Sequence, residues 1–227
     1  MPRRQEPQAH SCREPGMRLR ITFSKSGTLR YTGHLDLHRI WERTCRRAGI
    51  PLSYSQGFHP QPRISLAAAL PLGFIGQAEL VDLWLDQDED LNQILKDLQA
   101  AAPPGLMLTS IQSIDPQQPA LQTQVNSADY EVVFLDPVDP LHVTSSLTGI
   151  LSCVSIPRQR RGKDYDLRPL LKSLELIRTD NENSPILTMR LSVSPSATGR
   201  PEEVLAELGF SPENTRITRT RLILDNG

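Results

Sequence analysis

The sequence predicts an α+β protein made of two tandem ferredoxin-like lobes, each with the element order βαββαβ. Two observations lead to this prediction. Stretches with apolar residues at every second position alternate with stretches of helical apolar spacing, in the order strand, helix, strand, strand, helix, strand. The same order then starts again after a Gln- and Pro-rich stretch, although the two halves share little sequence identity.

The first lobe begins with a strand at residues 18–23, where Leu19, Ile21 and Phe23 alternate with polar residues and face inward. A helix follows at residues 34–48 and ends where a glycine and then a proline interrupt the pattern. The other elements of this lobe are strands at residues 63–70, 78–85 and 106–114 and an amphipathic helix at residues 91–101.

The second lobe repeats this order. Its elements are strands at residues 130–135, around 174–177, at 186–193 and at 216–224, helices at 141–152 and 201–208, and a basic loop after residues 154–158. We therefore expect four regions along the chain. They are a disordered leader at residues 1–16, the first lobe at 17–114, a linker at 115–127 and the second lobe at 128–227.

The helix at residues 34–48 has two chemically different faces. Its apolar face consists of Leu37, Ile40, Trp41, Thr44, Cys45 and Ala48. The opposite face carries four arginines, Arg39, Arg43, Arg46 and Arg47. Like charges at this spacing repel one another unless an anionic partner lies across them.

The chain has 227 residues, enough to bury a core as one large domain or as two small ones. Its cysteines, Cys12, Cys45 and Cys153, lie far apart, which excludes a disulfide framework and a paired metal-type spacing. No apolar run approaches the roughly 20 residues of a transmembrane helix, and no signal peptide opens the sequence. We therefore expect a reduced, cytoplasmic protein with no membrane partner.

The net charge is only −1, but the charges are unevenly distributed. Residues 17–64 and 158–172 are basic, whereas residues 79–97 carry seven acidic side chains against one lysine. This segregation favours an anionic partner on one face of the protein. The alternative is that these stretches are solvated faces with local counter-charges. The pI of about 6.5 supports the alternative, because dedicated nucleic-acid-binding domains usually exceed about 9.

Two stretches of the first lobe are unusually rich in functional side chains. They are residues 23–39 (FSKSGTLRYTGHLDLHR) and residues 46–65 (RRAGIPLSYSQGFHPQPRIS). Together with Asp166-Leu-Arg-Pro-Leu-Leu and Gly199-Arg-Pro-Glu-Glu-Val-Leu, they resemble the signature of the radical SAM-linked proteins of bacteria. That family is a domain of unknown function, often fused to a radical SAM enzyme or encoded beside one. The resemblance extends over nearly everything after Met17 and implies a radical SAM protein as the partner.

The sequence lacks the common marks of catalysis. A radical SAM cluster needs three closely spaced cysteines, and neither their CxxxCxxC motif nor a nucleophile elbow of the Gly-x-Ser-x-Gly type is present. His34 and His38 lie one helical turn apart, but Asp36 points to another side of the helix, so we expect no metal and no cofactor. A stand-alone, metal-independent RNA-processing enzyme with His34 or His59 as its base stays open as an alternative.

We therefore expect an accessory, non-catalytic domain that presents an RNA for modification to a radical SAM enzyme. Lysine and arginine side chains would contact phosphates, and aromatic rings would stack on unpaired bases. The residues expected to bind nucleic acid or the partner are Lys25, Arg30, Tyr31, His34, Asp36, Arg39, Arg43, Arg46, Tyr54, Gln56, Phe58, His59, Arg63 and Arg168. The alternative is a protein–protein adaptor that docks the enzyme without touching RNA, through the basic helix or the acidic residues 86–90.

Overall fold

The computed structural model describes residues 16–160, 162–177, 185–194 and 197–225. The first half contains β1 (Met17–Lys25), η1 (Gly27–Tyr31), α1 (His34–Arg47), β2 (Ile64–Leu66), β3 (Ile75–Leu85), α2 (Leu91–Ala101) and β4 (Leu106–Ile114). The second half contains α3 (Leu121–Gln124), β5 (Val125–Phe134), α4 (Pro140–Ser152), β6 (Pro157–Arg160), β7 (Lys163–Asp166), η2 (Arg168–Leu170), β8 (Leu171–Ile177), β9 (Ile186–Ser192), α5 (Pro201–Glu207), η3 (Pro212–Asn214) and β10 (Thr215–Leu224).

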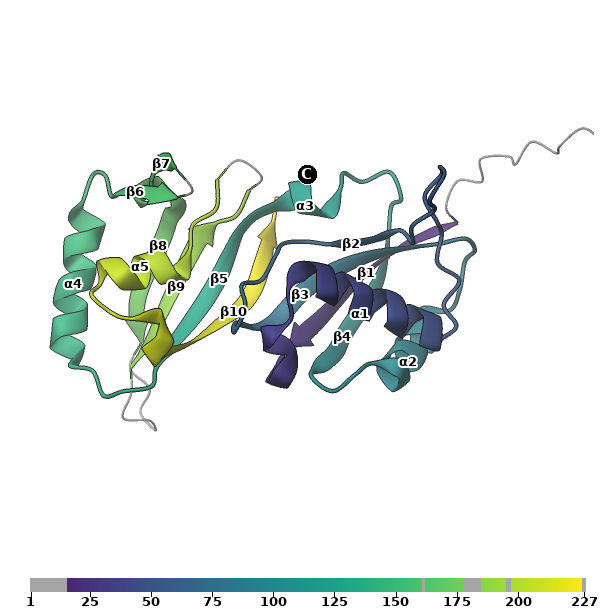
Figure 1. Ribbon diagram of the computed structural model, residues 1–227, viewed down its shortest axis with the longest axis horizontal. Helices are drawn as coiled ribbons and strands as arrows, with labels where there is room; N and C mark the ends of the chain where they lie inside the picture. Colours follow the sequence, from purple (N-terminus) through teal and green to yellow (C-terminus); the bar gives the residue numbers. More distant parts are fainter. Residues whose placement is uncertain (1–15, 161, 178–184, 195–196, 226–227) are drawn as a thin grey trace, which may run out of the picture.

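Within the described residues, the larger of two sheets has eight strands and runs through both halves of the molecule (Figure 1). Its strand order is β4-β1-β3-β10-β5-β9-β8, and β2 pairs with one end of β3. Neighbouring strands within each half are antiparallel, whereas β10 and β3 are parallel. This short parallel pairing, Thr218 with Ile75 and Arg219 with Gly76, joins the halves. The predicted α+β class is confirmed, and the division into two domains stays a prediction.

The buried apolar side chains form two clusters, and the second extends across the junction. In the first cluster the ring of Phe23 on β1 meets Trp41 of α1 edge-on, with ring centroids 5.0 Å apart. This contact fixes α1 against the sheet and confirms that the apolar face of the helix points inward. The second cluster includes Leu70 and Phe74, which come from the segment between β2 and β3. The first half therefore contributes side chains to the core of the second.

Part of the uneven charge seen in the sequence is neutralised inside the fold. Arg18 and Arg20 project from β1 on the side opposite Phe23, and both are buried. The carboxylate of Asp82 on β3 accepts from Arg18 Nη2 at 2.7 Å and from Arg20 Nε at 2.8 Å. Arg18 also donates to the backbone oxygens of Gln118 and Pro119. Basic and acidic segments thus pair with each other here, and residues before α3 lie over this part of the sheet.

One difference from the predicted elements lies between β2 and β3, and another is that α3 and the start of β5 occupy residues predicted as a linker. The strand expected at residues 63–70 ends at Leu66, although the apolar pattern continues. The reason is topological. β10 pairs with the start of β3, at Ile75 and Gly76, and therefore leaves no free edge there for a longer β2. The basic loop predicted after residues 154–158 is the hairpin of β6 and β7. Most of the expected leader, residues 1–15, lies outside the described residues.

Candidate nucleic-acid interface

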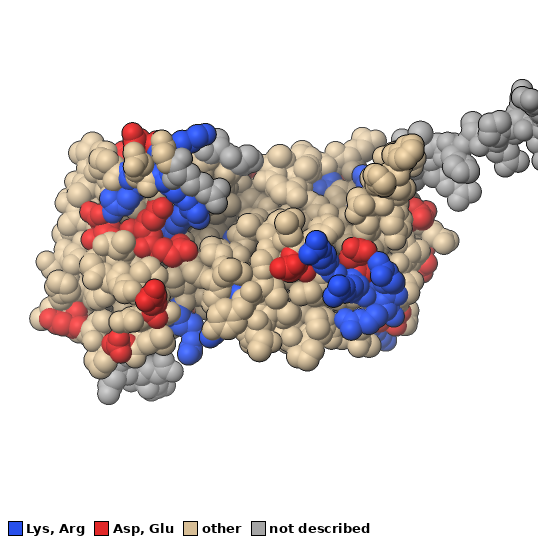
Figure 2. All heavy atoms as spheres, in the orientation of Figure 1, with Lys and Arg blue, Asp and Glu red and all other residues tan. Residues whose placement is uncertain are grey.

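The arginine face of α1 is exposed and forms a basic patch on the helix-covered side of the molecule (Figure 2). Arg46 pairs with Glu42 at 2.6 Å, and Arg39 pairs with Asp36 at 3.3 Å. Both pairs are exposed and join residues one helical turn apart, so they offset only part of the repulsion among the arginines. Arg43 has no ion pair among the described side chains. The patch is therefore open to an anionic partner.

The segment that follows α1, residues 52–63, folds into a narrow arm. Its two sides are held together by Arg63 N donating to Ser53 O at 2.8 Å and Ser55 N donating to Gln61 O at 2.8 Å. At its base, Ser53 N donates to Trp84 O of β3 at 2.7 Å. The arm is thus attached to the sheet like an extra hairpin, which leaves its tip free of backbone pairing.

Aromatic side chains project from this arm. Phe58 is 99% exposed and meets the His59 ring edge-on, with centroids 5.8 Å apart. Tyr54 and Gln56 are exposed as well. The exposed Phe58 ring leaves its faces free for a partner. The arm therefore presents rings suited to stacking on unpaired bases.

Arg63 stands at the base of the arm and supports it. Its guanidinium lies 4.9 Å from the centroid of the Trp84 ring, and Arg18 lies over the same ring at 4.7 Å. The contact of Arg63 with Trp84 fixes the arm on β3. Arg63 is partly exposed, so it can also take a phosphate.

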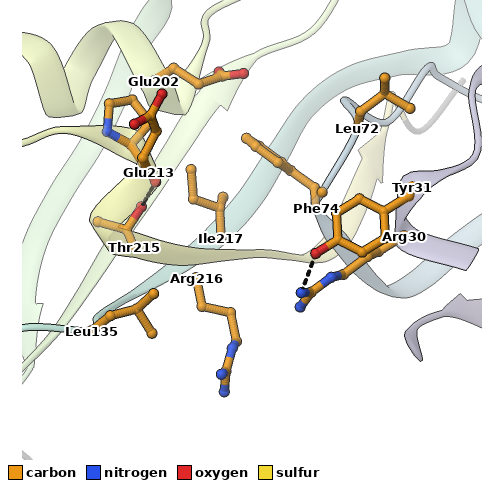
Figure 3. A pocket seen from close by; sticks show the side chains of 12 residues that line it. Arg30, Tyr31, Leu72, Phe74, Leu135, Glu202, Glu213, Thr215, Arg216 and Ile217 are labelled. Carbon is orange, nitrogen blue, oxygen red and sulfur yellow. Dashed lines mark hydrogen bonds between the residues drawn. The ribbon is translucent and has the colours of Figure 1, made fainter. Parts of the chain in front are cut away.

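Two cavities lie side by side where the halves of the sheet meet. We call them the first and the second seam cavity, with volumes of about 520 and 800 Å³. The first is lined by Arg30, Tyr31, Leu72, Gly73, Phe74, Leu135, Glu202, Pro212, Glu213, Thr215, Arg216 and Ile217 (Figure 3). Leu72 and Glu202 border both cavities. The predicted residues Arg30 and Tyr31 belong to the first.

In the first seam cavity Arg30 and Tyr31 form a unit. The Arg30 guanidinium lies 4.7 Å from the centroid of the Tyr31 ring and donates to the Tyr31 hydroxyl. This pair faces an apolar floor that includes Phe74 and Ile217 (Figure 3). A cation, a ring and an apolar floor thus border one cavity.

The second seam cavity is lined by His34, Tyr130 and three arginines, Arg160, Arg200 and Arg219. Burial, and then the nearby positive groups His38, Arg219 and Lys25, lower the pKa of His34. Burial likewise raises the pKa of Tyr130. Both shifts disfavour the charged forms, so His34 and Tyr130 present neutral hydrogen-bonding groups at pH 7.

Beneath this cavity lies a buried ion pair. Arg219 Nε donates to Glu79 Oε1 at 2.8 Å, and Arg219 Nη2 donates to Glu79 Oε2. The same guanidinium also donates to the backbone oxygens of Ala68 at 3.1 Å and Ala69 at 3.0 Å. Arg219 thus fixes the segment between β2 and β3 over the junction, and with it one wall of each cavity.

Two of the predicted residues are engaged in bonds to the backbone, and one of them, Lys25, is also buried. Lys25 is 1% exposed and donates to the backbone oxygen of Thr32 at 2.8 Å, and its burial lowers its pKa. Arg168 donates to the backbone oxygens of Leu151 and Cys153, which attaches η2 to the end of α4. Each of these side chains has a structural bonding role, and we leave both out of the proposed contact surface.

The buried pair Glu79 and Arg219 was missed from the sequence, although a signal for it was present. Glu79 continues the inward series of Val81 and Leu83 on β3, and Arg219 continues that of Ile217 on β10. A charged residue at an inward strand position requires a buried partner. Two such residues of opposite charge are therefore expected to be each other's buried partners.

Among the described residues, no group of three or more His, Cys, Asp or Glu side chains is placed to hold a metal ion. The described helices also include none that is long and apolar enough to cross a membrane.

Fold and surface together define a mixed α+β protein with an arginine-bearing helix, an aromatic arm and two cavities at the junction of its sheet. The chain belongs to the family DUF2344, described as an uncharacterized protein conserved in bacteria, whose model matches residues 18–201. No curated protein matches the chain.

Several solved structures show weak similarity. A chain of a Cbf5-Nop10-Gar1 complex aligns with a TM-score of 0.48 and 7% identity, over 90% of this chain and 48% of that one. A chain of an H/ACA RNP bound to a substrate RNA containing 2'-deoxyuridine gives 0.44 and 8%, over 90% and 47%. This chain thus spans about half the length of both. A putative glycine cleavage system transcriptional repressor gives 0.26 and 12%, over 92% and 98%.

Proposed function

We propose that this chain is a non-catalytic, cytoplasmic RNA-binding domain that serves a radical SAM enzyme by holding an RNA for modification. The observation that carries the proposal is that two complementary exposed surfaces lie on consecutive segments of the chain. The arginine face of α1 offers phosphate contacts, and the arm at residues 52–63 directly after it offers exposed rings. Phosphate contacts supply affinity for RNA, and stacking selects unpaired nucleotides.

The radical SAM partner rests on the resemblance of residues 23–39 and 46–65 to the radical SAM-linked proteins. Those two stretches contain η1, most of α1 and the whole arm. The residues that carry the resemblance therefore include most of the proposed RNA surface, and Arg43 lies outside both stretches. We expect the partner enzyme to act on an RNA bound there.

We also infer that each half of the sheet is a ferredoxin-like unit. The order β4-β1-β3-β2 in the first half and β10-β5-β9-β8 in the second places equivalent strands at equivalent positions. All pairings within the halves are antiparallel, as a split βαββαβ arrangement requires.

Fluorescence anisotropy with a labelled single-stranded RNA tests the proposal. The triple variant Arg39→Ala, Arg43→Ala, Arg46→Ala is expected to bind at least tenfold more weakly than the wild type at low salt, because three phosphate contacts are lost. The control variant is Lys163→Ala, Lys172→Ala, Arg221→Ala, which removes equal charge from exposed positions of the second half. If both triple variants lose the same affinity for RNA, the change in net charge alone would explain the loss. That result would contradict the proposal.

Purification of the tagged chain from its host separates the alternatives. Recovery of a radical SAM protein together with RNA supports the proposal. Recovery of that protein without RNA, combined with no RNA affinity in vitro, would support a protein–protein adaptor instead. Turnover of RNA by the isolated chain, lost in His34→Ala or His59→Ala, would show an RNA-processing enzyme.

A further inference from the structure

The first seam cavity is built from segments far apart in the chain. Arg30 and Tyr31 come from η1, Phe74 from the segment before β3, and Arg216 and Ile217 from β10 (Figure 3). Its volume of about 520 Å³ lies in the range of small-molecule sites, roughly 300–1,000 Å³. The cavity is therefore large enough for one nucleotide.

The surfaces of this cavity suit a flat, partly apolar ring. Leu72, Phe74, Leu135 and Ile217 supply its apolar lining, and the Tyr31 side chain stands beside them, 61% exposed. An exposed tyrosine next to an apolar floor offers one face for stacking and a second surface for packing. A nucleobase has this combination of a π face and polar edges.

Two buried polar atoms of the cavity lack partners. Arg30 Nε, a donor, and Glu202 Oε2, an acceptor, are both shielded from solvent and have no hydrogen-bond partner within the described part of the chain. A buried polar atom without a partner is unfavourable, and such atoms often mark a binding site. Figure 3 places the two side chains on opposite sides of the floor, so a ligand that satisfies both must span it. A nucleotide carries both acceptors and donors along its length.

Positive side chains border the cavity where a phosphate would lie. Arg216 lines the first seam cavity. The neighbouring second cavity adds Arg160 and Arg200, and the two cavities meet at Glu202. A nucleotide in the first cavity thus has cations within reach on both sides for the phosphates that flank it.

We propose that the first seam cavity binds one unpaired nucleotide, with its base beside Tyr31 and with Glu202 accepting one of its hydrogen bonds. This inference rests on the proposed function, because the nucleotide belongs to the RNA that α1 and the arm hold. It adds a site at which one base is drawn out of the strand for presentation to the partner.

The sign of the Glu202→Gln effect provides the sharpest test. If the cavity were only part of a charged surface, removing a negative charge would tighten the binding of RNA. If the Glu202 carboxylate accepts a hydrogen bond from the nucleotide, we expect the opposite. The affinity for RNA should then fall by about 5- to 10-fold, because charge-assisted hydrogen bonds are the stronger ones. Glu175→Gln is the matched control, since Glu175 is exposed and lines neither seam cavity. We expect this control to bind as tightly as the wild type or more tightly.

Tyr31→Ala is expected to weaken binding of a ten-nucleotide cytidine RNA by about 5- to 150-fold, the range found for loss of one stacked base. Tyr31→Phe retains the ring and should keep most of the affinity. Cytidine monophosphate, titrated alone and followed by NMR shifts of residues lining the cavity, shows whether a free nucleotide also enters. Thermal unfolding of each variant confirms that the fold is intact.

The outcomes separate the two proposals. If RNA binds through α1 and its affinity is unchanged by Tyr31→Ala and Glu202→Gln, the proposed nucleotide site is wrong. The proposed RNA-binding function would still stand. If cytidine monophosphate binds in the cavity but the chain has no affinity for RNA, the proposed function is wrong instead. The site would then take a free nucleotide. Tighter binding in Glu202→Gln would refute the assigned role of this carboxylate.

Discussion

Arg219 on β10 and Glu79 on β3 form a buried, two-pronged ion pair across the junction of the two halves, 140 residues apart in the sequence. The same guanidinium binds the backbone oxygens of Ala68 and Ala69. One side chain therefore joins the sheet, positions the segment between β2 and β3, and shapes the walls of both seam cavities.

Replacing Arg219 with methionine is expected to destabilise the protein by about 3–5 kcal/mol, because the Glu79 carboxylate stays buried without its partner. Denaturant unfolding followed by circular dichroism measures this loss. The double variant Arg219→Met, Glu79→Leu should recover part of it, since both charges are then removed. A single variant as stable as the wild type would show that the pair does not hold the halves together.

Gly76 faces Arg219 in the parallel pairing and must remain small. A Cβ atom there would lie 2.6 Å from Glu79 Cγ and 2.8 Å from Glu79 Oε1, and the ion pair prevents the carboxylate from moving aside. Gly76→Ala is therefore expected to cost about 1–3 kcal/mol in the free energy of unfolding. Gly149→Ala is the control, because its Cβ meets nothing and it lies inside α4, where alanine is favoured by about 1 kcal/mol.

Acid should weaken the second half through Asp129. Hydrogen bonds from Arg190, and to a smaller extent from Arg221, lower the pKa of this carboxyl from its ordinary value of 3.8. Its stabilising contribution is therefore complete above pH 3.8 and is lost as the pH falls through the lower pKa of the folded state. Unfolding measured across this range should depend less on pH in Arg190→Ala. An identical pH dependence in both proteins would contradict this assignment.

Cys45 and Cys153 should differ in reactivity. Burial raises the pKa of the Cys45 thiol to about 12, whereas Cys153 is exposed. Because the thiolate is the reactive form, Cys45 should resist alkylation at neutral pH until the protein unfolds. In a Cys12→Ser, Cys153→Ser variant, mass spectrometry after iodoacetamide treatment should show no label without denaturant. Rapid labelling of the native variant would mean that α1 opens from the sheet.

Phe58→Ala tests the arm. The side chain is 99% exposed, so its removal should leave the stability unchanged within about 0.5 kcal/mol. Loss of one stacking partner should weaken binding of single-stranded RNA by about 5-fold or more. Undiminished RNA affinity would remove the arm from the proposed interface.

Most elements follow from local patterns in the sequence, and α1 shows why. Its apolar residues recur at helical spacing, a glycine and a proline end it, and its arginines occupy the opposite face. Each of these properties depends on neighbours within a few turns. The positions of the arginine face and of the aromatic arm were predictable for the same reason.

The seam could not be predicted in this way, because it depends on a pairing between distant strands. The apolar residues after Leu66 fit a longer strand, and only the pairing of β10 with β3 excludes one. The cavities at the seam, and the burial of Lys25 beside it, are consequences of that pairing. Arg219 and Glu79 were the visible signs of it, as charges at inward positions of two strands.

The salt dependence of RNA binding tests the central claim most directly. For single-stranded RNA, the slope of log K against log salt becomes shallower by about 0.7 for each phosphate contact that is removed. The Arg39→Ala, Arg43→Ala, Arg46→Ala variant should therefore show a slope shallower than the wild type by about 2, and the control variant in the second half should show the wild-type slope. Equal slopes for the wild type and the α1 variant would contradict the claim that α1 binds the RNA backbone.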